Sequence, residues 1–158
     1  MKKSQEKLAF IGRPFADSLM DQQKSFAECN AQMENDQNFQ KFLQDNKLQS
    51  KRSSLIVFGP EHFMYWYGVI APAETVAPAG LMRFVLPQGQ VAEEELSEQT
   101  LAWFNQPLNT VLPPFLAKVS AEGIQVYENP GDSLTPYILQ HLNLSTKKLS
   151  QDLYLEDN

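Results

Sequence analysis

A run of aromatic residues is the feature of this sequence most suggestive of chemistry. Residues 62–72 read HFMYWYGVIAP and place Tyr65, Trp66 and Tyr67 in succession. A β-strand sends successive side chains to opposite faces, so Tyr65 and Tyr67 would share one face, and Trp66 and Met64 the other. One face is expected to pack under a helix. The other would be available to line a cleft, where aromatic rings bind flat or cationic ligands by stacking and through the ring quadrupole.

Aromatic residues from other segments are candidates to complete the wall and floor of the same pocket. A single ring on a half-buried strand is more often a core residue than a ligand contact, but the group as a whole favours a pocket. The candidate ligand-binding side chains of this kind are Tyr65, Trp66, Tyr67, Phe84, Trp103, Phe104, Tyr127 and Tyr154.

The sequence carries none of the common catalytic motifs. It has no Gly-x-Ser-x-Gly turn, no phosphate-binding loop of the Gly-x-x-x-x-Gly-Lys type and no His-Glu-x-x-His. An acid/base mechanism would need a carboxylate with a raised pKa inside an apolar cleft, and the sequence alone does not place Glu94 or Asp152 in one. Binding is therefore favoured over catalysis, and an enzyme remains an open alternative.

A metal site and a cofactor are not expected. His62 and His141 are isolated, and only the adjacent Glu61 offers a further ligand near either of them in the sequence. Cys29 has no cationic neighbours that would activate a thiolate, so it is expected in the core or at its boundary. The run of residues 93–95, EEE, is expected to be a solvated strand end or the approach to a helix, because charge runs seldom enter a core.

Size and composition limit the class of protein. The chain has 158 residues, 18.0 kDa and 42% hydrophobic residues, which suits one domain or two small halves that share a core. A net charge of -6 and a pI near 4.9 argue against a nucleic-acid partner. One cysteine excludes an internal disulfide and suits a reducing compartment. No apolar stretch is long enough for a signal peptide or a membrane span, so we expect a cytoplasmic protein without a membrane partner.

The first half is predicted to begin with a strand over residues 6–15, followed by a helix. Asp17 and Ser18 are good N-cap residues, and Leu19, Phe26 and Met33 recur at a helical spacing. A second helix is predicted around residues 39–43, where three apolar residues repeat the i, i+3, i+4 pattern.

The pattern then becomes extended. Residues 53–59 are apolar and β-branched, and Gly59, Pro60 and Glu61 form a tight connection into the aromatic segment, which predicts a β-hairpin.

The second half repeats this order. Residues 80–95 are predicted to be extended, with a bulge where Pro87 and Gly89 interrupt the strand. A helical region follows from Ser97, divided at Pro107 and at Pro113 with Pro114, and it ends at Gly123.

The last segments are predicted as strand, loop and strand. Residues 123–129, GIQVYEN, alternate as a strand does. Residues 129–146 are predicted to be a loop with one helical turn around residues 136–141. Residues 147–157 are predicted to form the closing strand.

Taken together, the order is strand, helix, strand, strand, repeated once. This order predicts an α+β fold of two pseudo-symmetric βαββ units whose antiparallel sheets meet around a central ligand cleft. We expect a single domain over residues 1–158, with halves of approximately 1–72 and 78–158.

Several segments resemble the gyrase-inhibitor-like, or bacterial effector-binding, family. APAGLMRFVLPQGQVAEEE is similar to that family's small-residue turn, glycine and apolar strand ending in proline, and EGIQVYENPGD to its later strand and polar turn. SQDLYLED looks like its final strand, LAFIGRPF like its opening strand and FMYWYGV like its aromatic strand. The resemblance extends over nearly the whole chain.

The resemblance implies a fold of two βαββ halves with a cleft that binds small organic molecules. Relatives sense drugs or inducers, and standalone members are associated with gyrase inhibition, toxin sequestration or hydrolysis of electrophilic cyclopropane compounds. The first strand begins almost at the start of the sequence, so a standalone form without a DNA-binding module is expected.

One position departs from the family pattern. The family commonly has a cleft-facing carboxylate on the strand that is similar to GIQVY, and this chain has Gln125 there. A neutral amide does not supply the charge that stabilises a buried cation. The resemblance thus implies that Gln125 contacts a neutral or weakly polar ligand, although an edge-strand hydrogen bond is an equal alternative. Glu94, Glu128 and Asp152 are nearby acids that could substitute for the missing charge.

Three classes of function follow from these observations. The first is a binding protein that senses or sequesters a small organic ligand. The second is a hydrolase of electrophilic molecules on the same scaffold. The third is an acidic inhibitor that binds a protein partner, and such a complex should weaken steeply with added salt.

Overall fold

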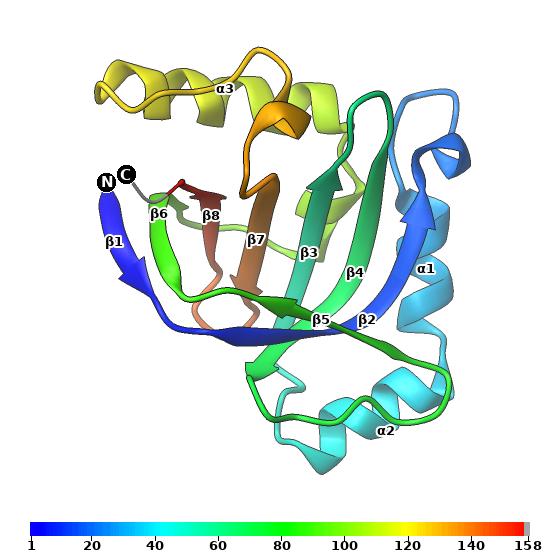
Figure 1. Cartoon of the computed structure of the whole chain (residues 1–158). Helices are drawn as coiled ribbons and strands as arrows, with labels where there is room; N and C mark the ends of the chain where they lie inside the picture. The colour runs from blue at the N-terminus through cyan, green and yellow to red at the C-terminus, as the bar shows by residue number, and fades with distance from the viewer. Residues whose placement is uncertain (157–158) are drawn as a thin grey trace.

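The computed structural model describes residues 1–156. Residues 157 and 158, which end the expected domain and include the end of the expected closing strand, lie outside the described part. The described residues form an eight-stranded antiparallel sheet with helices on its outside (Figure 1). No helix among them is long and apolar enough to cross a membrane.

The elements follow the repeated order that the sequence predicts. The first half contains β1 (Lys2–Gln5), β2 (Leu8–Ala16), the 3-10 turn η1 (Asp17–Leu19), α1 (Ala27–Glu34), α2 (Gln37–Asp45), β3 (Lys51–Phe58) and β4 (Phe63–Pro72). The second half contains β5 (Met82–Leu86), β6 (Gly89–Leu96), the 3-10 turn η2 (Leu101–Asn105), α3 (Leu108–Ala121), the 3-10 turn η3 (Pro130–Asp132), β7 (Tyr137–Asn143) and β8 (Lys148–Tyr154).

The order of strands in the sheet is β1-β6-β8-β7-β3-β4-β2-β5. Exchanging β1 with β5, β2 with β6, β3 with β7 and β4 with β8 gives the same order read backwards. The two βαββ units, β2-helices-β3-β4 and β6-α3-β7-β8, therefore occupy equivalent places on either side of the central β3–β7 pair. The predicted α+β fold class is confirmed.

One bent ribbon joins the two ends of the sheet. β1 pairs with β6 from Lys2 opposite Ala92, and β2 pairs with β5 from Leu8 opposite Leu86. Leu8 lies six residues after Lys2, and Leu86 lies six residues before Ala92. The two pairings therefore continue the same antiparallel register along the chain. Because β1 and β2 belong to opposite ends of the strand order, this ribbon curls the sheet into a half-barrel (Figure 1).

The sheet has an outer face covered by helices and an inner face on the concave side. The outer core contains the buried apolar side chains of α1, α2, η2 and α3 packed on the sheet. The inner core takes buried side chains from every strand except β1: Leu8, Phe10, Leu55, Trp66, Leu86, Val91, Leu139 and Tyr154.

The first helical region is shorter than the sequence suggests. Asp17–Leu19 form only a 3-10 turn, with Leu19 exposed, and α1 begins at Ala27. Phe26 and Met33 are buried as predicted. The side chain of Asp21 instead accepts hydrogen bonds from the backbone N–H groups of Gln23 and Ser25, which holds the intervening residues in a turn.

The second helix and the hairpin are confirmed. Asp36 is the N-cap of α2, its side chain accepts a hydrogen bond from the N–H of Phe39 at 2.9 Å, and the predicted apolar face is buried. β3 and β4 pair as a hairpin from Phe58 opposite Phe63.

Two predictions for residues 123–146 are wrong. Residues 124–127 of GIQVYEN are irregular, and the strand forms later, as β7, where a loop with a helical turn was predicted. In β7, Ile138 and Leu142 are buried against the helices and Leu139 is buried on the inner face, so the segment has the alternation of a central strand. The polar Gln140 and His141 within it obscure this alternation in the sequence.

Prolines also act differently from the prediction. Pro107 precedes α3 as its N-cap, but Pro113 and Pro114 lie inside the continuous helix rather than dividing it. Pro87 falls between β5 and β6, so the predicted bulge is a break between two strands. Gly123, just beyond α3, has a positive φ and ends the helix as predicted.

Candidate functional site

A continuous row of aromatic rings crosses the inner face of the sheet. Phe10 contacts Trp66 with ring centroids 6.1 Å apart, and Trp66 contacts Phe84 at 5.7 Å. Phe84 contacts Tyr137 at 5.5 Å, and Tyr137 contacts Tyr154 at 5.8 Å. All four pairs are edge-to-face, the favourable arrangement for ring quadrupoles. We call these five residues the aromatic row.

The aromatic row ends at a pocket formed by residues of the described part of the chain, which we call the end pocket. It has a volume of about 600 Å³ and lies where the C-terminal part of α3 and the irregular residues 123–127 meet the ends of β7 and β8. Tyr137 and Tyr154 line it together with the apolar side chains of Phe58, Leu116, Ile124, Val126, Ile138 and Leu153. Gln90, Gln125, Ser133 and Thr135 line it as well, so the cavity combines apolar and aromatic walls with polar groups.

Few charges border the end pocket. Among residues 1–156, Lys2 and Glu156 are the charged residues that line it. Glu156 accepts hydrogen bonds from the backbone N–H of Leu134 at 2.7 Å and from the hydroxyl of Tyr127 at 3.0 Å, and these bonds lower the pKa of the carboxyl. One cation and one anion leave the lining close to neutral overall.

The predicted ligand-binding residues fall into two groups, those on the inner face or in the end pocket and those in the outer core. Trp66, Phe84 and Tyr154 belong to the aromatic row, and Gln125, Tyr127 and Tyr154 line the end pocket. Gln125 is exposed and lies in an irregular segment, not on a strand. The other four, Tyr65, Tyr67, Trp103 and Phe104, lie in the outer core.

These four outer-core residues hold the helices against the sheet. Tyr65 stacks on Phe26 with centroids 4.1 Å apart, and its hydroxyl donates to Asn30 of α1 at 2.8 Å. The hydroxyl of Tyr67 donates to Glu34 at 2.6 Å. Burial raises the pKa values of both tyrosines, which keeps both phenols neutral.

Trp103 and Phe104 fix η2 in the same way. The indole N–H of Trp103 donates to the buried Gln140 of β7 at 3.2 Å, and Phe104 packs edge-on against Tyr67 at 5.7 Å. None of the four lines the end pocket.

Two residues of the aromatic row were not predicted. Phe10 is two residues from the inward-facing Leu8 in the opening strand and therefore shares its face, and this spacing was the available signal. Tyr137 lay in a segment that was predicted to be a loop, so its face of the sheet could not be inferred.

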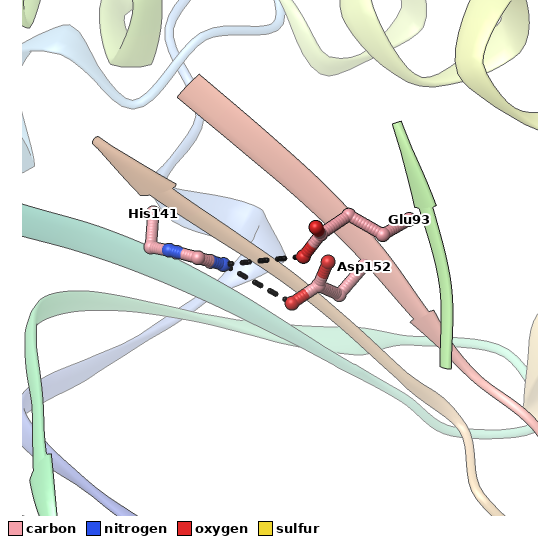
Figure 2. Close-up of side chains that lie close together, drawn as sticks. All are labelled: Glu93, His141 and Asp152. Carbon is pink, nitrogen blue, oxygen red and sulfur yellow. Dashed lines mark hydrogen bonds and ion pairs between the residues drawn. The ribbon is translucent and has the colours of Figure 1, made fainter. Parts of the chain in front are cut away.

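A polar cluster lies on the inner face, formed by Glu93 of β6, His141 of β7 and Asp152 of β8 (Figure 2). Glu93 and Asp152 are directly opposite each other in the β6–β8 ladder. The Nε2 atom of His141 lies 3.1 Å from Asp152 Oδ2 and 3.9 Å from Glu93 Oε2. Figure 2 shows all three side chains converging from their separate strands.

This cluster corrects two expectations. His141 is not isolated, because strand pairing brings two acids to it from positions 48 and 11 residues away. Glu93 is not a solvated strand end, since only 12% of its side chain is exposed. Of the other acids considered, Asp152 is in the cluster, whereas Glu94 lies near the N-terminal amine of Met1 and Glu128 is exposed.

Burial and proximity perturb both carboxyl groups. Burial and the neighbouring carboxyl group of Asp152, opposed by Lys3, raise the pKa of Glu93 to about 7. Burial disfavours the charge of Asp152, but the hydrogen bond with His141 and the proximity of Glu93 outweigh it, and the pKa of Asp152 is lowered. Asp152 therefore carries the charge of the pair, and Glu93 is the group that holds a proton most readily.

A second, smaller pocket of about 310 Å³ reaches this cluster. It is lined by His141 and by Ser53 and Ser150, the residues directly opposite His141 on the two neighbouring strands. We call it the side pocket. It shares no lining residue with the end pocket.

Comparisons with known proteins show a similarity of fold. No family model matches the sequence. No curated protein matches it either. Among solved structures, SAV2435 bound to tetraphenylphosphonium has a TM-score of 0.57 and 8% identity over 98% of this chain and 90% of that one. A putative bacterial transcription regulation protein from Staphylococcus aureus MU50 has a TM-score of 0.53 and 9% identity over 99% of this chain and 97% of that one. At sequence identities this low, the similarity shows a shared fold and does not assign a function.

Proposed function

We propose that this protein binds a small organic molecule with aromatic surface in the end pocket, to sense or sequester it. The observation that carries the proposal is a cavity of about 600 Å³ whose wall includes the rings of Tyr137 and Tyr154 together with polar side chains. Ligand pockets in proteins have volumes of roughly 300–1,000 Å³ and use aromatic walls with placed polar groups to orient the ligand.

The ligand we propose is neutral or weakly polar. Lys2 and Glu156 oppose each other in charge, and Glu156 is already satisfied by Tyr127 and Leu134. Gln125, on the pocket lining, offers an amide that both donates and accepts hydrogen bonds. The polar groups of the pocket are thus suited to carbonyl, hydroxyl or amide groups of a ligand.

Two observations support a relationship to the gyrase-inhibitor-like, effector-binding family. The sequence segments described above resemble that family, and the strand order has the two-unit symmetry that the family fold implies. We propose one domain with halves of approximately 1–72 and 78–158. SAV2435 binds an organic cation, so cationic compounds belong in any ligand test.

A thermal-shift panel tests the proposal. Purified protein is heated with neutral, cationic and anionic aromatic compounds, and a ligand that binds only the folded state raises the melting temperature. A selective rise with neutral compounds is expected. Gln125→Glu adds a carboxylate at the exposed edge of the pocket and should extend the response to cations.

A pocket-filling variant locates the binding. Leu116→Trp enlarges a half-buried residue that lines the end pocket and should abolish the shifts, whereas Val76→Trp adds the same ring at an exposed position and should preserve them. A panel without any selective shift, or shifts that survive Leu116→Trp, would rule out the end pocket as the ligand site.

A further inference from the structure

Glu93, His141 and Asp152 together offer one imidazole nitrogen and two carboxylate oxygens. One ligand atom from each residue lies within 4.8 Å of the other two. His141 Nε2 is 3.1 Å from Asp152 Oδ2 and 3.9 Å from Glu93 Oε2. A tetrahedral ion with bonds of about 2.0–2.2 Å needs ligand atoms about 3.3–3.6 Å apart, so small side-chain rotations are enough to match the geometry.

A second observation is that the cluster and its surroundings contain buried polar atoms without a binding partner in the described part of the chain. The side chain of Asp152 is fully buried, and its Oδ1 atom has no hydrogen-bond partner among residues 1–156. The hydroxyl of Ser53, directly opposite His141 in the β3–β7 ladder, is also buried without a partner in the same part of the chain. Buried polar atoms are nearly always paired, so two such atoms beside one histidine indicate a missing ligand.

The electrostatics of the cluster favour a cation as that ligand. Glu93 and Asp152 are directly opposite each other on the neighbouring strands β6 and β8, and both carboxyl groups are largely removed from water. Two adjacent buried carboxylates need a shared proton or a bound cation. Lys3 supplies part of this charge, since its Nζ atom lies 2.8 Å from Glu93 Oε2. It does not hydrogen-bond Asp152.

We propose that Glu93, His141 and Asp152 bind a divalent transition metal ion, with Zn²⁺ as the preferred ion. One imidazole and two carboxylates suit zinc, whereas Mg²⁺ and Ca²⁺ require more oxygen ligands than this cluster provides. Three protein ligands leave the fourth position of the ion open. The side pocket borders the cluster at His141.

Lys3 is the residue that the ion must displace. It belongs to the short edge strand β1, and 41% of its side chain is exposed, so its ammonium group can turn toward solvent. Removing this competing charge should strengthen metal binding without disturbing the core.

The test is a titration of the full chain, free of any histidine tag, with Zn²⁺ alone by calorimetry. We expect one equivalent to bind. Glu93→Gln and His141→Gln should each weaken binding by at least about 100-fold, more than the loss of a supporting residue does. His62→Gln removes the other histidine, which is exposed, and should leave the affinity unchanged.

Lys3→Met keeps the test decisive if a cluster variant fails to fold. Loss of the ammonium group beside Glu93 should raise the Zn²⁺ affinity about 10-fold, because a like charge within about 4 Å of the ion is removed. No binding by the wild type, equal affinity in wild type and Lys3→Met, or a loss of binding in His62→Gln would each overturn the proposal.

Discussion

Tyr137 lies where the aromatic row and the end pocket meet. Its ring contacts Phe84 on one side and Tyr154 on the other, and it also forms part of the pocket wall. A ligand in the end pocket would therefore extend the same series of edge-to-face contacts. Tyr137 thus connects the packing of the inner core with the ligand site that we propose.

Replacing Tyr137 separates these two roles. Tyr137→Phe keeps both ring contacts and should leave stability and binding nearly unchanged. Tyr137→Ala should lower the free energy of unfolding by about 3 kcal/mol and weaken an aromatic ligand about 10-fold, since an edge-to-face pair contributes about 0.5–1.5 kcal/mol. Chemical denaturation and calorimetric titration measure the two effects. Equal ligand affinity in the alanine variant would exclude Tyr137 from the site.

Asp36 gives a prediction on pH dependence. Its carboxylate accepts the hydrogen bond from the Phe39 N–H and pairs with Arg13, and despite the opposing effect of burial its pKa is lowered below 3.8. A lowered folded-state pKa stabilises the fold above the unfolded-state value, and this contribution is lost as the pH falls through the folded-state value.

Asp36→Ala should thus lower the free energy of unfolding by about 1 kcal/mol at pH 7. The difference between wild type and variant should shrink as the pH falls below 3.8. Urea denaturation of both proteins across this range measures it. A difference that stays constant down to the acid transition would show that the charge of Asp36 does not contribute.

At the scale of elements, β2 and β4 approach each other closely at a pair of glycines. Gly12 and Gly68 are directly opposite each other. A Cβ atom on Gly68 would lie 2.0 Å from the carbonyl oxygen of Ile11, and one on Gly12 would lie 2.1 Å from that of Tyr67. Backbone atoms cannot move aside as a side chain does, so both positions require glycine.

Gly68→Ala should accordingly lower the free energy of unfolding by about 3 kcal/mol, at the upper end of the cost of overpacking. Gly89→Ala is the matched control, because Gly89 also lies in a strand and a Cβ atom there meets nothing within 4 Å. Thermal and urea denaturation of both variants make the comparison. Similar stabilities for the two would contradict the close approach of β2 and β4.

At the scale of the whole molecule, the bent ribbon of β1–β2 and β5–β6 determines the inner face. It joins the two βαββ units and curves the sheet (Figure 1). The aromatic row and the polar cluster lie on the same inner face of this sheet. The end pocket lies at one end of this arrangement, against the tyrosines of β7 and β8. The two units together thus build a surface that neither has alone.

The sequence was informative where periodicity is simple. The α+β class, the β3–β4 hairpin and the apolar face of α2 follow from clean alternation and helical spacing. β7 was missed because Gln140 and His141 interrupt its apolar pattern, although both are satisfied by neighbours in the fold.

The candidate site was predictable only in part. Aromatic residues can be listed from a sequence, but the face that each one occupies depends on strand register, which placed Tyr65 and Tyr67 in the outer core. The polar cluster could not be read from spacing at all, since its three residues meet only through the pairing of β6, β8 and β7.

The most direct measurement of the central claim is a crystal structure of the protein with the compound that gives the largest thermal shift. We predict that the compound occupies the end pocket and contacts Tyr137 and Tyr154 from the side of α3. A compound bound elsewhere, with the end pocket unchanged, would contradict the proposed ligand site.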